Sequence, residues 1–289
     1  MVYYTNMISM RLCQRAGLMA VAISLTWLAG GCGGSPAPQA SGTDAPPATG
    51  LPSTGPAPAT SPAVAPSQVA VLAGVTVGID PGHNGLNGTD PAYINHLVWN
   101  GRAWETCDTT GTETDAGYTE ALFNFRVATF LRADLLRDGA HVVMTRTTNQ
   151  GVGPCVNRRA QILNHSHANV AIDIHADGGP GTGRGFAVLE PVADGPNNKV
   201  IAASVRFGRD VRAALLAHTA MPVSTYDGVN GVVFRNDLAG LNLTRVPKIL
   251  IECGNMRNAT DAAMLTSTLF QQQLARAFEA AIIRFLHRS

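Results

Sequence analysis

The sequence predicts an α/β domain in which a mostly parallel, twisted sheet is covered by helices on both faces. Within residues 71–289, short apolar runs alternate with helical patterns, and this alternation is typical of parallel strands joined by helical crossovers. The runs are apolar almost throughout, which indicates strands that are buried on both faces. A segment of this length suits a single domain.

The expected elements follow one another along this segment. The first strand is expected at 75–80. A helix at 119–137 is amphipathic and stops before Gly139, a residue that commonly terminates helices. Further strands are expected at 140–145, 169–175, 185–190 and 248–252, and further helices at 157–164, at 199–218 and between 261 and 288.

Residues 1–34 have the pattern of a secretory signal peptide. Arg11 and Arg15 precede an apolar run that is shorter than the about 20 residues needed to span a bilayer. Cys32 and its small neighbours resemble a lipoprotein cleavage site, but Leu28 stands four residues before the cysteine where three is usual. Lipidation at Cys32 and plain secretion both remain open.

Residues 35–70 are expected to form an extended linker. They hold nine of the 17 prolines, one charged residue (Asp44) and no aromatic residue, so they cannot bury a core. The whole chain has a hydrophobic fraction of 45%, which excludes wholesale disorder. Its net charge of +1 argues against nucleic acid as the main partner, because phosphate binding requires a basic excess.

Several predicted strands end in residues that can carry out chemistry. His83 follows the first strand, His175 ends another, and Glu252 lies in the last. Ligands collect beyond the carboxyl ends of such strands, and Glu120, at the start of a helix, faces the same edge. Two imidazoles and a carboxylate are the ligand set of a catalytic zinc, and Glu252 is the candidate general base. Singly, each residue also has a structural explanation, such as a first-turn acid for Glu120.

The order of these residues resembles the zinc-dependent N-acetylmuramoyl-L-alanine amidases of the amidase-3 family across essentially all of residues 75–287. The stretch 237–243 resembles the secreted mycobacterial and actinobacterial members. The matching motif positions are Ile79–His83, Glu120, Thr145-Arg146, Arg159, Asn164, Ile174–Ala176, Glu252, Gly254, Asn258 and Asp261.

The resemblance implies a peptidoglycan hydrolase that binds one zinc ion through His83, Glu120 and His175, with Glu252 catalytic. It implies cleavage of the amide between N-acetylmuramic acid and the L-alanine of the stem peptide. We expect peptidoglycan or muropeptide fragments as partners, a monomer, and export to the cell envelope, periplasm or medium. Substrate contacts or supporting contacts are expected at Asn84, Asp177, Arg184 and Asn255.

Some positions depart from the family pattern. Asp173 and Asp177 stand where Ser and Asn are usual, and Cys253 and Asn255 stand where Leu and Phe are usual. These residues surround the ligands, so they bear on metal tuning and substrate preference. Two alternatives stay open: a silent muropeptide-binding or regulatory protein, which would be expected to lose a ligand or the catalytic Glu, and another zinc cell-wall peptidase.

Cys107 and Cys155 are expected to form a disulfide. Export would place the domain in an oxidising compartment. Of the cysteines left after signal removal, Cys32 lies beyond the linker and Cys253 lies in an apolar strand, where a buried free thiol is usual.

The long connection at 84–117 joins two candidate zinc ligands and has no clear helical pattern. Connections of this length inside a compact domain are commonly functional. We therefore expect a hairpin-like flap over the zinc site, pinned by the disulfide and free at its tip near Val98–Trp104. A passive surface insertion is the alternative.

Overall fold

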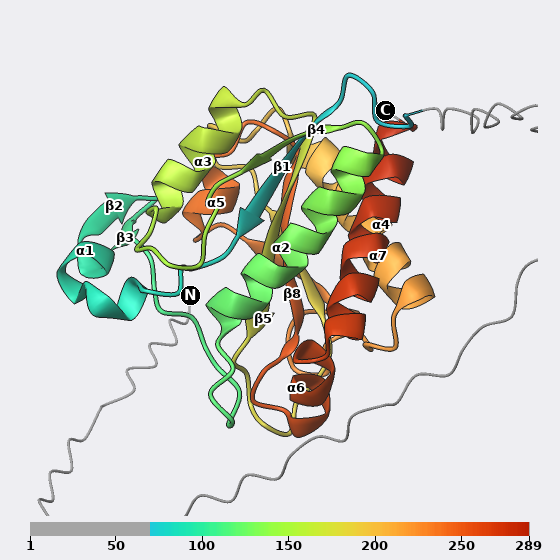
Figure 1. Cartoon of the computed structure of the whole chain (residues 1–289). Coiled ribbons are helices and arrows are strands. Elements are labelled where there is room, and N and C mark those ends of the chain that lie inside the picture. The colour runs from blue at the N-terminus through green and yellow to red at the C-terminus, as the bar shows by residue number, and fades with distance from the viewer. Residues whose placement is uncertain (1–69, 289) are drawn as a thin grey trace, which may run out of the picture. The chain divides into compact units, whose positions relative to one another are not determined.

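The computed structural model describes residues 70–288 (Figure 1). The predicted signal peptide, Cys32 and residues 35–69 of the linker lie outside the described residues, so they stay predictions. Among residues 70–288, the helices are too short or too polar for any of them to cross a membrane.

Six strands form one sheet in the order β4-β1-β5-β8-β6-β7. Neighbouring strands are parallel except β6 and β8, which are antiparallel. The predicted mostly parallel sheet is thereby confirmed. The strands span Thr76–Pro81 (β1), His141–Met144 (β4), Val170–Asp177 (β5), Ala187–Pro191 (β6), Val232–Arg235 (β7) and Lys248–Asn255 (β8).

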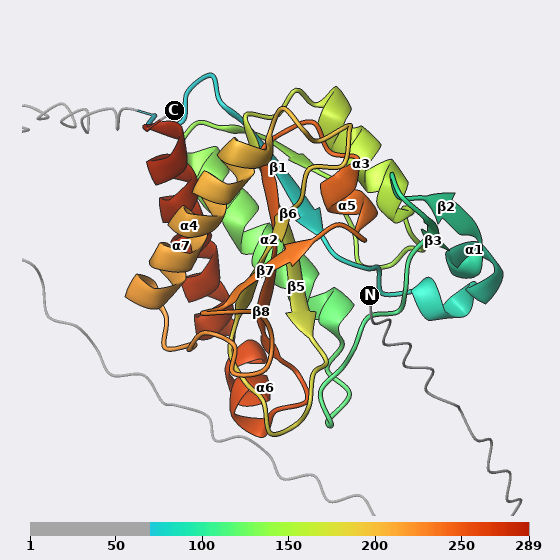
Figure 2. The same ribbon diagram turned by 180° about the vertical axis from the view of Figure 1, so that it is seen from behind.

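Helices cover both faces of this sheet (Figures 1 and 2). The long helices α2, α4 and α7 pack together on one face, and the short helices α3 and α5 contact each other on the other face. The helices span Glu120–Arg137 (α2), Val156–His165 (α3), Ile201–His218 (α4), Ala239–Asn242 (α5), Ala259–Leu265 (α6) and Thr268–Leu286 (α7).

The main hydrophobic core lies between the sheet and the three long helices. Alternate strand residues such as Ile79, Ile172 and Ile251 are fully buried there against α2 and α7, whose Phe278 is also fully buried. Each such side chain contributes about 1.5–3 kcal/mol to folding when it leaves water. We call this side of the sheet the helical face.

Side chains of successive strand residues point to opposite sides of a sheet. The strand residues next to those isoleucines in the sequence therefore point away from the helical face, toward α3 and α5. They include Asp80, Asp173, His175, Lys248 and Glu252. We call this side the polar face.

Helix α2 begins where the sequence predicts. The Thr119 hydroxyl caps it by accepting from the backbone N–H of Leu122, and Glu120 occupies the first turn, where a carboxylate suits the helix dipole. Gly139, with φ of 90°, follows its end. Strand β7 and helix α5 were not predicted, because each is only four residues long.

The connection between the two ligand candidates is more regular than expected. A single 3-10 turn (η1) spans Asn87–Thr89, a short helix (α1) spans Pro91–Asn95, and strands β2 (Leu97–Trp99) and β3 (Trp104–Thr106) form an antiparallel hairpin. The expectation of a hairpin is confirmed. The expectation of no helix is wrong, because Asp90 caps α1 by accepting from the N–H of Tyr93.

Candidate metal centre

The carboxyl ends of β1, β5 and β8 meet at one edge of the sheet, and the N-terminus of α2 reaches the same edge (Figure 1). His83 follows β1, and Glu120 is the first residue of α2. His175 of β5 pairs in register with Glu252 of β8. The structure thus brings together the four residues that the sequence singled out.

The donor atoms of His83, Glu120 and His175 all lie within 4.8 Å of one another. Nε2 of His83 is 3.2 Å from one carboxylate oxygen of Glu120, and Nδ1 of His175 is 2.8 Å from the other. Two imidazole nitrogens and a carboxylate oxygen form the donor set of a catalytic zinc site, which keeps its fourth position open. The three residues therefore fit a zinc ion.

Two glycines make the close approach of these side chains possible. A Cβ at Gly82 would lie 2.1 Å from the His175 ring, so no other residue fits between β1 and that imidazole. A Cβ at Gly111 would lie 2.7 Å from Oε2 of Glu120, and Gly111 also has φ of 73°. Larger residues at either position would push the donor atoms apart.

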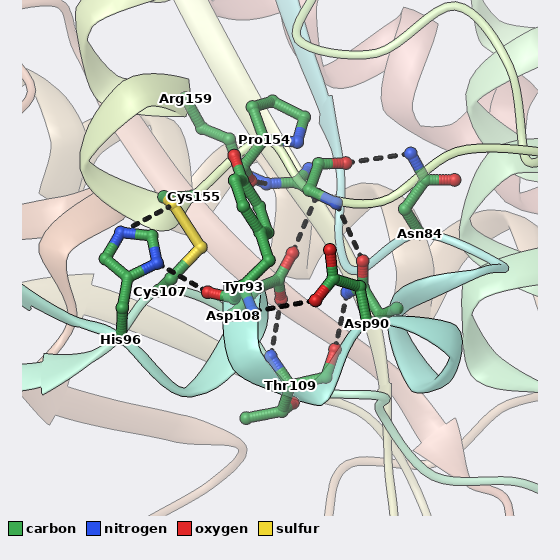
Figure 3. The surroundings of a disulfide bond; sticks show 12 residues. Asn84, Asp90, Tyr93, His96, Cys107, Asp108, Thr109, Pro154, Cys155 and Arg159 are labelled. Atoms are coloured by element: carbon green, nitrogen blue, oxygen red, sulfur yellow. Dashed lines mark hydrogen bonds and ion pairs between the residues drawn. A yellow bond between two sulfur atoms is a disulfide. The ribbon is translucent and has the colours of Figure 1, made fainter.

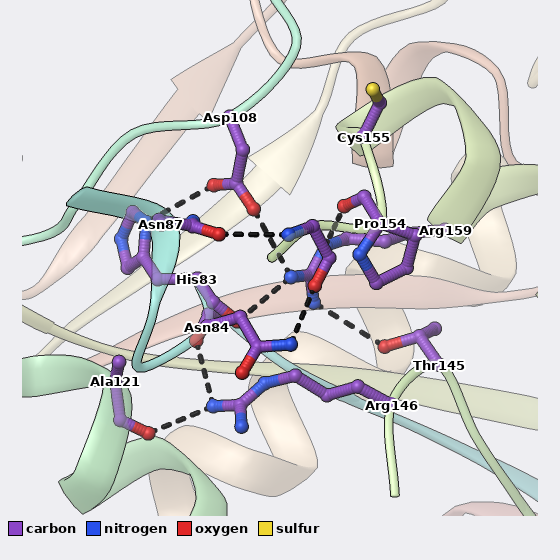
Figure 4. A network of polar contacts seen from close by, with 12 residues as sticks. His83, Asn84, Asn87, Asp108, Ala121, Thr145, Arg146, Pro154, Cys155 and Arg159 are labelled. Carbon is purple, nitrogen blue, oxygen red and sulfur yellow. Dashed lines mark hydrogen bonds and ion pairs between the residues drawn. The ribbon is translucent and has the colours of Figure 1, made fainter. Parts of the chain in front are cut away.

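Two buried arginines hold the backbone that bears His83, which has φ of 56° (Figure 4). Arg159 donates to the carbonyls of Pro81 and His83 at 2.7 and 2.8 Å. Arg146 donates to the carbonyl of Pro81 at 2.9 Å and to that of Ala121, in the first turn of α2, at 2.8 Å. The arginines thereby fix the loop after β1 against the start of α2.

The charges around the imidazoles favour their protonated forms in the metal-free chain. Burial opposes the charge on His83, but the carboxylates of Glu120 and Asp108 outweigh it and raise its pKa to about 9. Burial likewise opposes the charge on His175, yet Asp173 and Glu120 raise its pKa well above the usual range. The same pairs hold the pKa of Glu120 well below its ordinary value, against burial. The site is therefore built to attract a cation.

Glu252 lies beside this cluster without joining it. Its Oε2 is buried and has no hydrogen-bond partner among the described residues. Burial raises the pKa of Glu252 to about 8, with His175 opposing the rise and the carboxylates of Glu120 and Asp177 adding to it. A carboxylate that titrates near neutrality, with a free oxygen next to a metal donor set, suits proton transfer.

Three of the four residues expected to contact substrate lie close together. Asp177 pairs in register with Asn255, and Arg184 and the backbone N–H of Asn255 both donate to the carboxylate of Asp261. Asn84 donates at 2.8 Å to a backbone carbonyl in the loop before α3. Arg184 pairs with a carboxylate at the start of α6 at 3.0 Å, and Asn255 donates to two carbonyls of the 180–183 loop at 2.8 Å. Asp177 accepts from the hydroxyl of Tyr226 at 2.7 Å, and burial together with the charges of Asp177 and Glu252 raises the pKa of that hydroxyl. All four thus make internal contacts, and their role toward substrate stays a prediction.

The β2–β3 hairpin forms one wall of a cavity of about 220 Å³ that reaches His83 and His175 from the polar face. Its tip is docked, so the expectation of a free tip is wrong. Arg102 pairs with Asp194 at 3.4 Å, and Asn100 donates to the carbonyl of Asp237 at 3.2 Å. Glu105 accepts from the first backbone N–H of α5. These polar partners lie more than 90 residues away along the chain, and no local pattern predicts their pairing.

The predicted disulfide between Cys107 and Cys155 is confirmed (Figure 3). It joins the end of the hairpin to the start of α3 and forms a small separate core with Val98. His96 lies 3.6 Å from the sulfur of Cys155, but both sulfurs are occupied by the disulfide and leave no thiolate for a metal. Cys253 is a buried free thiol, as expected.

Sequence reasoning missed two charged residues on the polar face. Asp108 contacts His83, and Lys248 is fully buried between Asp80 and Asp173. One signal was available: Lys248 directly precedes the apolar run 249–251, and a buried lysine requires a carboxylate partner. Its partners could not be named, because they come from strands far away in the sequence.

The fold and this cluster together define a class: an α/β protein whose sheet carries a possible His/Glu/His metal site at the carboxyl ends of its parallel strands. Comparison with known proteins agrees with that class. The family model described as N-acetylmuramoyl-L-alanine amidase matches residues 77–284, and the chain belongs to this family.

Individual relatives are similar over most of the chain. The N-acetylmuramoyl-L-alanine amidase Rv3717 of Mycobacterium tuberculosis is 39% identical over 75% of this chain and 88% of its own length. The crystal structure of the N-acetylmuramyl-L-alanine amidase Ami1 from Mycobacterium smegmatis is 40% identical, with a TM-score of 0.71, and covers 75% of this chain and 99% of its own. The amidase AmiC2 of Nostoc punctiforme, 22% identical with a TM-score of 0.57 over 74% of this chain and 98% of its own, shows the shared fold.

Proposed function

We propose that this protein is a zinc-dependent N-acetylmuramoyl-L-alanine amidase. It would cleave the amide between N-acetylmuramic acid and the first residue, L-alanine, of the peptidoglycan stem peptide. The observation that carries the proposal is the donor set of His83, Glu120 and His175 within 4.8 Å, with the unpartnered oxygen of Glu252 beside it. The amidases with 39% and 40% identity support the choice of bond.

In this proposal, His83, Glu120 and His175 hold the zinc ion and Glu252 moves the proton. A zinc ion in such a site supplies Lewis acidity, which polarises a carbonyl and lowers the pKa of water to roughly 7. Glu252 would accept a proton from the attacking water on its free Oε2 and deliver it to the L-alanine nitrogen as that nitrogen departs. A covalent intermediate on the protein is not required.

The proposal includes export. Residues 1–34 have a signal-peptide pattern, and Cys107 and Cys155 form a disulfide of the kind that persists in oxidising compartments. The amidase would then act as a monomer on peptidoglycan or its fragments in the cell envelope, periplasm or medium. Cys32 is the candidate for a lipid anchor, and residues 35–70 would separate the domain from it.

Digestion of purified muropeptides, followed by mass spectrometry, tests the proposal. The protein should release intact stem peptides and free the lactyl carboxylate of N-acetylmuramic acid. A chelator should abolish the release, and added zinc should restore it. Cleavage inside the stem peptide would assign a zinc peptidase instead. Binding of muropeptides with no cleavage, by protein that carries one zinc per chain, would indicate a silent binding protein.

A further inference from the structure

Each imidazole of the candidate metal centre contacts a second carboxylate on the side opposite Glu120. Nδ1 of His83 lies 3.2 Å from Oδ1 of Asp108, and Nε2 of His175 lies 3.4 Å from Oδ1 of Asp173. The ring nitrogens that face Glu120 are the other two, Nε2 of His83 and Nδ1 of His175. Each ring is therefore held between two carboxylates.

Both of these carboxylates are bound by buried cations. Arg159 contacts Oδ2 of Asp108 at 3.2 Å (Figure 4), and Lys248 contacts Oδ2 of Asp173 at 3.0 Å. Asp80 joins the two cations, since its carboxylate lies 3.1 Å from Arg159 and 2.7 Å from Lys248. An unbroken series of charged contacts thus runs from one imidazole to the other. We call these five residues the buried charge series.

The composition of the buried charge series needs an explanation beyond stability. Asp80 and Lys248 are each 1% exposed, and removing such ions from water costs several kcal/mol apiece. Apolar side chains of similar volume commonly stabilise a fold at least as well as a buried ion pair. Three carboxylates against two cations leave one excess negative charge, which complements a bound dication.

The two ends of the series are not equivalent. Nδ1 of His83 also lies 3.1 Å from the carbonyl oxygen of Thr109, so that ring keeps an acceptor without Asp108. For Nε2 of His175, the contacts among the described residues give only Asp173. Oδ1 of Asp173 is itself buried and makes no hydrogen bond with the other described residues, so it is free to accept.

We propose that Asp173 and Lys248 are positioning residues for the metal centre, an inference that rests on the proposed zinc site. Lys248 fixes the carboxylate of Asp173 through Oδ2. Oδ1, which lies 3.4 Å from Nε2 of His175 and has no hydrogen-bond partner among the described residues, would accept the Nε2–H once the metal is bound, which leaves Nδ1 as the metal donor. Partners of this kind commonly change metal affinity by about 10–100-fold when they are removed.

Two variants of the full chain separate positioning from simple charge balance. Asp173→Ala leaves Lys248 with one carboxylate fewer, so the metal-free protein should unfold more easily and its zinc Kd should rise about 10–100-fold. In Asp173→Ala combined with Lys248→Met, the series regains the single excess negative charge of the wild type, because Asp80 and Asp108 then face Arg159 alone. The zinc Kd, measured by chelator competition, should stay raised.

A return of the wild-type zinc Kd in the double variant would overturn the proposal, because the pair would then only balance charge. An unchanged Kd in Asp173→Ala would overturn it as well. Asp210→Ala is the matched control: Asp210 is buried and paired with Arg284 on the helical face, so it should lower stability without changing the zinc Kd.

A second measurement needs no variant. Long-range proton–nitrogen NMR on the zinc-loaded wild-type protein should show His175 with a metal-bound Nδ1 and a protonated Nε2. The reversed assignment would overturn the proposal while leaving the amidase activity standing. If the wild-type protein binds no zinc at all, the proposed function fails first, so the two failures are distinguishable.

Discussion

The two faces of the central sheet use the same strands for different purposes. On β5, Ile172 and Ile174 enter the core against the long helices, while Asp173 and His175 face the polar side. Helices α2, α4 and α7 cover the first side continuously, whereas α3, α5 and the hairpin leave a cavity of about 220 Å³ on the other. One face holds the fold together, and the other holds reactive groups in place.

This difference shows how a buried strand can carry charge. A strand residue on the polar face can be as far from water as its neighbours while its side chain contacts ions and not methyl groups. Lys248 is 1% exposed and Ile249 is fully buried, and only the direction of the side chain separates them. Ionic partners must be placed closely. Substitutions on the polar face should therefore mainly reduce activity, and substitutions on the helical face should mainly reduce the free energy of unfolding.

The largest expected effect is a loss of hydrolysis with no loss of stability. Glu252→Gln removes the group that moves the proton and keeps the volume of the side chain. Hydrolysis of muropeptides should fall by about 10²–10⁴-fold. Zinc content per chain and the thermal midpoint should stay at the wild-type level or above, because a buried carboxylate has been neutralised. Wild-type turnover in this variant would refute the role of Glu252, and loss of zinc would make it a ligand.

The second prediction is a variant that lowers stability without changing zinc binding. Phe278 of α7 is fully buried in the main core on the helical face. Phe278→Ala should lower the free energy of unfolding by about 3–5 kcal/mol, through lost burial and the cavity left behind. The zinc Kd and the turnover of the folded fraction should be unchanged. A weakened zinc Kd would mean that the two faces are coupled through the sheet.

The third prediction concerns the hairpin, which packs outside the main core. Replacing Cys107 and Cys155 together by serine opens a loop with a sequence separation of 48 residues. The chain-entropy model gives a loss of about 4 kcal/mol, and measured values for native disulfides are typically 2–5 kcal/mol. Asp108 directly follows Cys107, so the zinc Kd should also weaken. Denaturant unfolding and chelator competition measure the two effects, and an unchanged Kd would show that Asp108 holds its place without the disulfide.

The sequence predicted the helical face well and the polar face in part. Apolar runs and helix caps depend on neighbouring residues, so β1, β5 and α2 lie within two residues of their expected bounds, and β8 runs three residues past its expected end. His83, Glu120, His175 and Glu252 were found because each occupies a strand end or a helix start.

The partners of these residues could not be predicted from the sequence. The ion pair between Asp80 and Lys248 joins residues 168 positions apart, and only the strand order β1-β5-β8 brings them together. The docked tip of the hairpin depends in the same way on Asp194 and Asp237. Local patterns carry no information about such register. Long-range ionic contacts are therefore what a structure adds to a sequence of this kind.

The smallest expected effect tests a strand carboxylate that lies on the helical face. Glu190 of β6 points toward the helical face. Its Oε1 lies so close to Gly208 of α4 that a Cβ added to this glycine would lie 2.4 Å from it. Burial raises the pKa of Glu190 to about 7, and Arg209 offsets the rise only in part. A raised carboxyl pKa means that the folded protein loses stability as the pH rises from the ordinary value of about 4.5 through 7.

Glu190→Gln removes that loss. The free energy of unfolding of this variant should match that of the wild type near pH 4 and exceed it by about 1–3 kcal/mol at pH 8. Denaturant unfolding at both pH values measures this, and hydrolysis should be unchanged because Glu190 lies on the opposite face from the metal donors. Equal stability of the two proteins at pH 8 would show that Arg209 fully compensates the charge, and the helical face would then tolerate an ion as well as the polar face does.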